Sequence, residues 1–170
     1  MACAYAFDDP AMIEPERPAD AAAAEDLVDA AFGPGRYAKT AERLREGNTP
    51  VLAFVARRDR RVVGSVRLWP VTVGGAPALF LGPIAVDEAE RKSGVGAALV
   101  EAACAAAEER GWSTVLLVGD TPYFGRFGFQ RAEGVTLPGP VDPRRVLVRC
   151  AGEARRGMVV ASLTHSGYRS

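Results

Sequence analysis

The sequence predicts a mixed α/β domain in which antiparallel hairpins are followed by a parallel strand–helix–strand unit. The chain has 170 residues, which is the length of one domain rather than two. Two pairs of runs rich in β-branched and aromatic residues are each joined by a short turn, as in β-hairpins. An apolar strand, a long alanine-rich segment and another apolar strand come next, and this order favours a right-handed parallel crossover.

The composition is that of a globular protein, with 48% hydrophobic and 25% charged residues. Lys plus Arg and Asp plus Glu each number 21, so the formal net charge is zero. This balance argues against a dedicated nucleic-acid-binding protein, which needs a basic excess. No apolar run approaches the roughly 18 to 20 residues that span a bilayer, and the start MACAYAFDDP lacks the basic region of a secretory signal. We expect no membrane partner.

The three cysteines, Cys3, Cys104 and Cys150, are widely spaced and form no CxxC motif. This pattern argues against a disulfide framework or a zinc site and favours the reducing cytoplasm. His165 is the only histidine and lies in a Gly/Ser-rich tail, where we expect it to be solvated. Neither a Ser-His-Asp triad nor a metal site is therefore expected.

Residues 1–10 are predicted to be a flexible N-terminal extension, and residues 11–170 a single domain. The domain begins with a short strand over 11–17, which Pro15 weakens.

Two helices are predicted next. Asp20 is placed to cap a helix over 21–32, and the glycines and proline of 33–35 end it. A second helix is predicted over 38–46, with Gly47 as its stop. The buried face of the first helix is expected to comprise Leu27, Val28 and Ala31.

The first hairpin is predicted from strands over 51–56 and 62–69, joined by the link Arg57–Arg61. Four arginines in this link leave a nucleic-acid-binding tip as an alternative, although charged hairpin tips are usually solvated turns. The second hairpin turns at Gly74-Gly75 and continues into a strand over 78–86.

That strand contains Gly82-Pro83 in its middle. Because proline cannot donate a ladder hydrogen bond, we expect the strand to be bulged or unpaired on one side there. Such a break leaves backbone groups with which a ligand can pair.

A polar loop over 87–93 leads to a long helix over 94–110, which Gly111 closes. The apolar run 113–118 is predicted to be a buried strand, and 122–127 a short helical turn. Weaker strand signals follow at 145–150 and 157–163.

The start of the long helix has the features of an anion site. Arg91 and Lys92 are followed by Gly94 and Gly96, and the free N–H groups of a helix start attract anions. A Rossmann fingerprint is excluded because Leu99 stands where its third glycine would be. A P-loop motif is absent. The alternative that the glycines only permit close helix–sheet packing stays open.

Three motifs follow one another between Leu81 and Phe129: the bulged strand Leu81–Val86, the motif Arg91-x-x-Gly94-x-Gly96 and the segment Tyr123–Phe129. In this order they resemble the GNAT superfamily of N-acetyltransferases. The form GDxPYxxRFGF is similar to a subgroup of predicted N-acetyltransferases of undefined substrate. The resemblance covers about 11–150.

The resemblance implies a GNAT-like fold: a central, mostly antiparallel twisted sheet, a parallel pair of bulged fourth and fifth strands, and helices on both faces. It also implies acetyl-CoA as co-substrate, with its pantetheine arm between strands ending at Val86 and Val118. Direct attack by an amine in a ternary complex would follow, assisted by an N–H of the bulged strand. The implied acetyl-CoA-binding residues are Ile84, Ala85, Val86, Arg91, Lys92, Ser93, Gly94, Val95, Gly96, Phe124 and Arg126.

The catalytic acid and base are less clearly marked. Many family members place a tyrosine where this chain has Phe124, so Tyr123 is the candidate acid, with solvent as the alternative. Strand 78–86 holds no Glu, Asp or His, so a base comes from elsewhere or acts through water. Asp120 is a candidate base, and the alternative is that it caps the short helix after it.

The resembled fold places the acceptor pocket between the first two helices, the second hairpin and the C-terminal strands. The candidate acceptor residues are Asp29, Phe32, Arg36, Arg67 and Trp69. Arg67 and Trp69 share one face of their strand by the period of two, although a surface arginine beside a half-buried tryptophan explains the pair as well. We therefore expect an N-acetyltransferase acting on a small-molecule or protein amine. The alternatives are an acyl-CoA-binding module with little turnover and, less favoured, a nucleic-acid-binding domain; a homodimer stays open.

Overall fold

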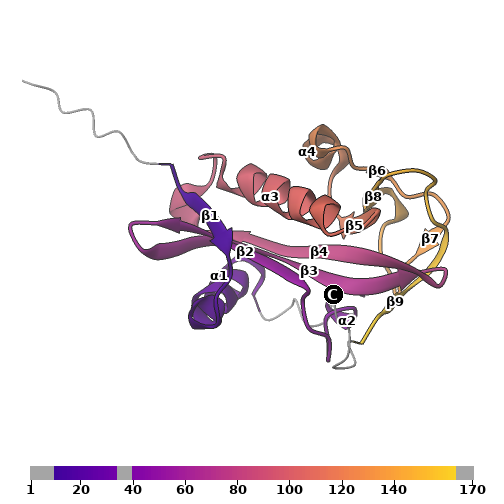
Figure 1. The fold of residues 1–170 in the computed structure, drawn as a ribbon, viewed down its shortest axis with the longest axis horizontal. Helices are drawn as coiled ribbons and strands as arrows, with labels where there is room; N and C mark the ends of the chain where they lie inside the picture. Colours follow the sequence, from indigo (N-terminus) through magenta and orange to yellow (C-terminus); the bar gives the residue numbers. More distant parts are fainter. Residues whose placement is uncertain (1–9, 34–39, 164–170) are drawn as a thin grey trace, which may run out of the picture.

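The computed structural model describes residues 10–33 and 40–163. Within these ranges the chain forms a mixed sheet with helices on both faces (Figure 1). The strands are β1 (Met12–Pro15), β2 (Leu52–Arg58), β3 (Arg61–Val73), β4 (Ala76–Val86), β5 (Thr114–Val118), β6 (Gln130–Arg131), β7 (Val135–Thr136), β8 (Val146–Cys150) and β9 (Gly157–Ala161). The helices are α1 (Ala21–Phe32), α2 (Thr40–Arg43), α3 (Val95–Glu109) and α4 (Thr121–Phe124).

The main sheet has the order β1-β2-β3-β4-β5-β8-β6, and β9 pairs with the far end of β3 and with β7. Strands β1 to β4 are antiparallel to one another. Strands β4 and β5 are parallel, and β8 is antiparallel to both β5 and β6. Figure 1 shows α3 on one side of the sheet and α1 and α2 on the other. The predicted mixed fold with one parallel pair is confirmed.

Two hydrophobic clusters hold these layers together. On the α3 side, buried residues of that helix pack against strands β2 to β5. A Cβ added at Gly64 would lie 2.9 Å from both Val95 and Leu99, so β3 owes its close approach to α3 to a glycine in the strand. On the opposite face, Leu44 packs in a cluster with Trp69 and other residues from β3, β4, β5 and β8.

The predicted bounds of α1 are confirmed, but the role of Asp20 is corrected. Asp20 stands at the N-cap, yet its side chain makes no capping bond. It accepts the Arg17 N–H at 3.0 Å and pairs with Arg57 at 2.9 Å. The Arg17 N–H and then the Arg57 guanidinium hold the pKa of Asp20 below its ordinary value. A long-range partner from β2 therefore competes successfully with the local cap.

The buried face of α1 also differs from the expectation. Ala24 and Val28 are buried and Leu27 is half-buried, whereas Ala31 is exposed. The helix contacts the sheet one turn earlier than predicted. For the second helix, α2 ends at Arg43 and turns continue to Gly47, while residues 38–39 lie outside the described ranges.

Strand β3 is longer than predicted because it continues through Pro70 to Val73. Its partner on one side is β2 up to Leu68 and β9 from Val71. Pro70 falls between these two partners, and its carbonyl accepts the N–H of Ser162. The missing N–H of Pro70 therefore lies where no ladder bond is required. The turn at 74–75 is where the sequence predicts it.

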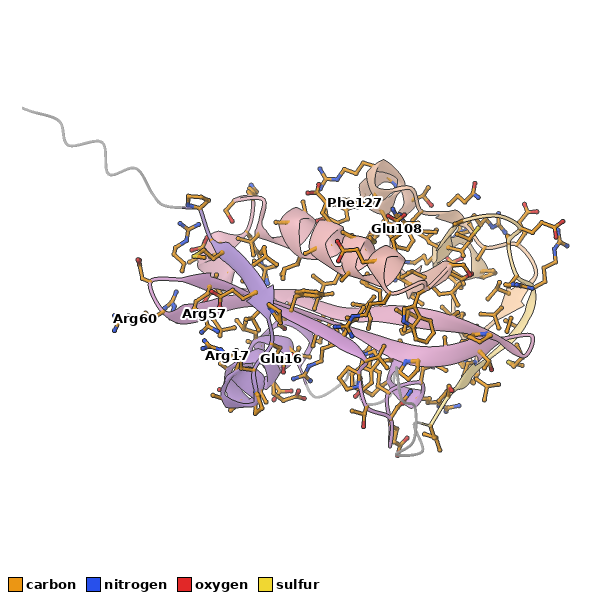
Figure 2. The ribbon with its side chains drawn as sticks, viewed as in Figure 1. Glu16, Arg17, Arg57, Arg60, Glu108 and Phe127 are labelled. Carbon is orange, nitrogen blue, oxygen red and sulfur yellow. The ribbon has the colours of Figure 1, made fainter. Side chains whose placement is uncertain are left out.

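The basic link of the first hairpin is mostly strand. The turn is made by Asp59 and Arg60, which both have positive φ. Figure 2 shows Arg60 at the outer tip, whereas Arg57 lies close to β1. Arg57 pairs with Glu14 at 3.0 Å and Arg58 with Glu90 at 2.8 Å. These acids neutralise much of the cluster that suggested a nucleic-acid-binding tip.

The remaining elements agree closely with the expected ones. Helix α3 is followed by Gly111 at φ +80°, and β5, β8 and β9 each lie within or at the bounds expected for them. The short strands β6 and β7 were not predicted. Of the predicted extension, residues 1–9 lie outside the described ranges, as do Cys3 and His165. No helix in the described parts of the chain is long and apolar enough to cross a membrane.

Candidate functional site

The sheet opens between β4 and β5. These strands pair at two positions, Leu79 with Val115 and Phe80 with Leu116. Beyond this point β4 continues to Val86 but no longer pairs with β5. The edge of 81–86 that faces β5 is therefore a place where an extended ligand can add its own hydrogen bonds.

The opening coincides with the predicted bulge in β4. Val66 pairs with Ile84 and Leu68 with Leu81, so Gly82-Pro83 together lie opposite a single β3 residue. The prediction of a bulge at this dipeptide is confirmed. Because a bulge bends its strand and increases the local twist, it accounts for the separation of β4 from β5.

Two side chains brace the bulge. The Trp69 indole donates a hydrogen bond of 2.6 Å to the carbonyl of Gly82. Gly82 has φ +137°, and a Cβ there would lie 2.9 Å from Nη2 of Arg45. Arg45 is itself held by an ion pair of 3.1 Å with Glu42 and lies over the Phe80 ring, 5.6 Å from its centroid. A glycine is required here by the backbone angle, which other residues rarely adopt.

A cavity of about 240 Å³ opens on the bulge. Its wall is mostly apolar, and Arg45 and Arg145 are its charged members. No carboxylate stands among the described residues of this wall. The wall is made by Val28 and Phe32 of α1, Ala41 and Arg45, residues 80–84 of β4, Leu117 and Val118 of β5, Phe124 and Arg145.

The start of α3 lies beyond the other end of the open β4 edge. Gly94 has φ +87° and no atom within 4 Å of an added Cβ, so close packing does not explain this glycine. The first bond of the helix runs from the Ala98 N–H to the Gly94 carbonyl, at 3.0 Å. The preceding N–H groups therefore have no partner within the helix, and exposed Arg91 and Lys92 flank them. This arrangement is suited to an anion.

Two further residues of this segment have distinct roles. Lys92 adopts φ +70°, an uncommon angle for a residue other than glycine. The Ser93 hydroxyl donates to the carbonyl of Glu90, so this side chain is turned back into its own loop. The Ser93 N–H donates to the same carbonyl, at 3.1 Å, so the predicted role of Ser93 in ligand binding is not supported.

The α4 turn separates the roles of its two aromatic residues. Phe124 lines the cavity, and a Cβ at Gly119 would overlap its ring. Tyr123 lies outside the wall, with its hydroxyl 3.2 Å from the position of a Cβ at Gly96. Arg126 stacks over the Tyr123 ring at 4.5 Å. The Tyr123 hydroxyl is thus at the α3 start and not in the cavity.

Asp120 does not cap α4 with its side chain. Its carboxylate pairs with Arg145 at 3.2 Å, and both side chains are at least half exposed. Asp120 does not line the cavity, but its partner Arg145 does. The expected cap is therefore replaced by a contact with the segment before β8.

Of the predicted acceptor residues within the described ranges, only Phe32 lines the cavity. Asp29 is exposed and outside it. Arg67 is bound by Glu16 at 2.8 Å and Glu25 at 3.1 Å; the hydrogen bond to Glu16 is the main cause that raises its pKa. Trp69 supports the bulge as described above, and Arg36 lies outside the described ranges.

The sequence interpretation missed the two cavity arginines. Arg45 is four residues after Ala41, and both line the cavity, so helical spacing gave a signal for it. Arg145 has no such local signal, because β5 and β8 bring it to the site by pairing Val118 with Val146. No group of three side chains suited to a metal ion occurs in the described ranges.

Comparisons with known proteins agree with this geometry. A family model described as the acetyltransferase (GNAT) family matches residues 21–129. The uncharacterized N-acetyltransferase YhbS of Escherichia coli K12 is 35% identical over 124 residues, covering 71% of this chain and 74% of that protein.

Two solved structures are similar over most of both chains. One is a GNAT family N-acetyltransferase (YhbS) from Escherichia coli in complex with CoA, with TM-score 0.79, 29% identity and 90% of each chain covered. The other is a GNAT family acetyltransferase from Brucella melitensis in complex with acetyl-CoA, with TM-score 0.71 and 29% identity, covering 92% of this chain and 96% of that one.

Proposed function

Because the chain belongs to the GNAT family of acetyltransferases, we propose that it transfers the acetyl group of acetyl-CoA to a primary amine of a small molecule or protein. The observation that carries this proposal is the open edge of β4. It runs from the cavity at Gly82 to Val86, and the α3 start follows in the chain. A thioester, its extended arm and its pyrophosphate need these three parts in this order.

Acetyl-CoA would be bound largely by backbone. The N–H groups at the start of α3 would take the pyrophosphate, with Arg91, Lys92 and Arg126 as nearby cations. The N–H groups of Arg91 and Ser93 are excluded, because they donate to the carbonyls of Glu88 and Glu90. The arm would pair with the edge formed by Ile84, Ala85 and Val86 like an added strand. The remaining members of this set are Gly94, Val95 and Gly96 through their backbone, and Phe124 through its ring. Ser93 is not a member, because its N–H and its hydroxyl both donate to the Glu90 carbonyl.

The transfer requires one bond to form and one to break. The amine nitrogen would bond to the acetyl carbon while the carbon–sulfur bond breaks, and an N–H of the bulged strand would stabilise charge on the carbonyl oxygen. The amine must lose a proton, and reference amine pKa values of about 8 to 10.4 leave little neutral amine at pH 7. Asp120, acting through water, is our candidate base, and Tyr123 or solvent the candidate source of a proton for the thiolate.

One observation supports a second candidate, an acyl-CoA-binding module with little turnover. Phe124, which has no proton to give, occupies the cavity beside the bulge, whereas the Tyr123 hydroxyl lies at Gly96. A chain that binds acetyl-CoA without an acid at the sulfur would release CoA slowly.

Two measurements on the same protein separate these functions. Calorimetry measures acetyl-CoA binding, and a thiol assay measures CoA release over a panel of amines. Binding with release supports the enzyme, binding without release on any amine supports the module, and no binding refutes both. Arg91→Ala should weaken acetyl-CoA binding several-fold, while Arg110→Ala, an exposed arginine at the other end of α3, should not.

A further inference from the structure

The cavity carries a charge pattern that the transfer reaction by itself does not require. Arg45 and Arg145 enter its wall from opposite sides of the sheet opening, one after α2 and the other before β8. The rest of the described wall is neutral. An acceptor in this cavity therefore meets two guanidinium groups.

Arg45 is a fixed charge. Its side chain is only 13% exposed, and its Nη1 is paired with Oε2 of Glu42 at 3.1 Å. Its Nη2 is on the side of Gly82, at the bulge. A guanidinium has five N–H donors in a planar fork, so it can hold one protein carboxylate and still donate to a second, planar anion.

Arg145 is also paired with one protein carboxylate. Its Nε is paired with Oδ1 of Asp120 at 3.2 Å, and its backbone carbonyl accepts the Gly119 N–H at 2.8 Å. Neither Asp120 nor Glu42 lines the cavity. Each arginine thus belongs to the wall while its protein carboxylate lies outside it.

From this pattern we propose that the acceptor is a small amine that also carries a carboxylate, which Arg45 and Arg145 bind, and that apolar walls hold its body. This inference rests on the proposed function and names the substrate class for the same site. A polyamine gains no counter-charge from the described wall. The nearby cations also favour the neutral, nucleophilic form of the reacting amine.

The apolar wall defines the rest of the acceptor. Val28, Phe32, Phe80, Leu117 and Phe124 line the same cavity. They would bury an aliphatic or aromatic body while the carboxylate faces the arginines. An apolar amino acid satisfies both requirements, and its uncharged relatives satisfy only one.

The test uses matched trios of amines with saturating acetyl-CoA: phenylalanine, phenylalaninamide and phenethylamine, and leucine, leucinamide and isoamylamine. The expected kcat/KM is roughly 10- to 100-fold higher for each amino acid than for its amide, the effect of one charge-assisted hydrogen bond. The amine of each amide is less basic than that of the amino acid, so a larger fraction of it is neutral and reactive. This difference by itself would favour the amide, which makes the expected preference for the amino acid a stringent test. Equal or higher rates for the amides in the native protein would overturn the proposal.

Variants assign the effect to the arginines. At saturating acetyl-CoA, Arg45→Gln should bring the acid-to-amide ratio close to one, whereas Arg45→Lys should retain part of the preference. Arg43→Gln is the matched control, because Arg43 is an exposed arginine of α2 outside the cavity. If Arg45→Gln does not fold, Arg145→Gln serves, with Arg144→Gln as its control. A ratio that survives in Arg45→Gln and Arg145→Gln also overturns the proposal.

A binding measurement keeps this proposal separate from the enzymatic one. N-acetylphenylalanine should bind the CoA-saturated protein more tightly than N-acetylphenylalaninamide, and Arg45→Gln should abolish the difference. Acid-selective binding without turnover on any amine refutes the acetyltransferase but supports the anion site. Turnover without acid preference refutes the anion site alone, as does the absence of binding by either acetylated compound.

Discussion

Trp69→Phe should lower both the stability of the protein and the rate of acetyl transfer. The indole N–H of Trp69 donates to the Gly82 carbonyl at 2.6 Å, and the side chain is nearly buried. Phenylalanine keeps the ring but leaves this buried carbonyl without its donor, which costs about 1–3 kcal/mol. For a chain of this size each kcal/mol corresponds to a fall in Tm of about 2–4 °C.

The same substitution tests whether the bulge is part of the site. Denaturant unfolding gives the loss of stability, and CoA release with a saturating amine gives kcat. Trp112→Phe is the control. Trp112 is half-buried just after the C-terminal end of α3 and packs on the hydrophobic cluster of the α3 side, away from the bulge. If Trp69→Phe matched Trp112→Phe in stability and left kcat unchanged, the indole would not brace the bulge.

Three other substitutions have expected outcomes. Gly64→Ala places a Cβ 2.9 Å from Leu99 and should lower the free energy of unfolding, measured with denaturant, by about 1–3 kcal/mol. Gly125→Ala, with open space around it, should lower it far less. Equal losses in the two variants would contradict the packing argument. Asp20→Asn should be less stable than the native chain at pH 7. Because folding lowers the pKa of Asp20, that difference should shrink as the pH falls below about 3.9 and through the lower folded pKa, and a difference that persisted in acid would contradict it. Tyr123→Phe should lower kcat without abolishing acetyl-CoA binding, and an unchanged kcat would remove Tyr123 from the mechanism.

Features that depend on neighbouring residues were predicted well from the sequence. The bulge follows from Gly82-Pro83, because proline cannot donate in the ladder wherever the strand lies. The start of α3 could likewise be predicted, because Gly94 adopts a positive φ that glycine allows. The bounds of α1 match because its periodicity and the stop at Gly33 are local as well.

Features that depend on distant partners were predicted less well. The sequence placed Arg67 in the acceptor pocket, but Glu16 and Glu25 bind it from β1 and α1. It made Asp20 a cap, but Arg57 of β2 reaches its carboxylate. Such ion pairs join residues tens of positions apart, and only the register of the strands brings them within reach.

The sequence by itself determined the order of elements, the broken strand and the glycine-containing start of α3, since backbone angles and hydrophobic periods are set within a few residues. The tertiary structure alone decided which charges meet at the cavity. Arg45 and Arg145 are 100 positions apart by number, and only the docking of α2 and the pairing of β5 with β8 place both against the bulge. The charge pattern of the cavity is therefore a property of the packed sheet and not of any one segment.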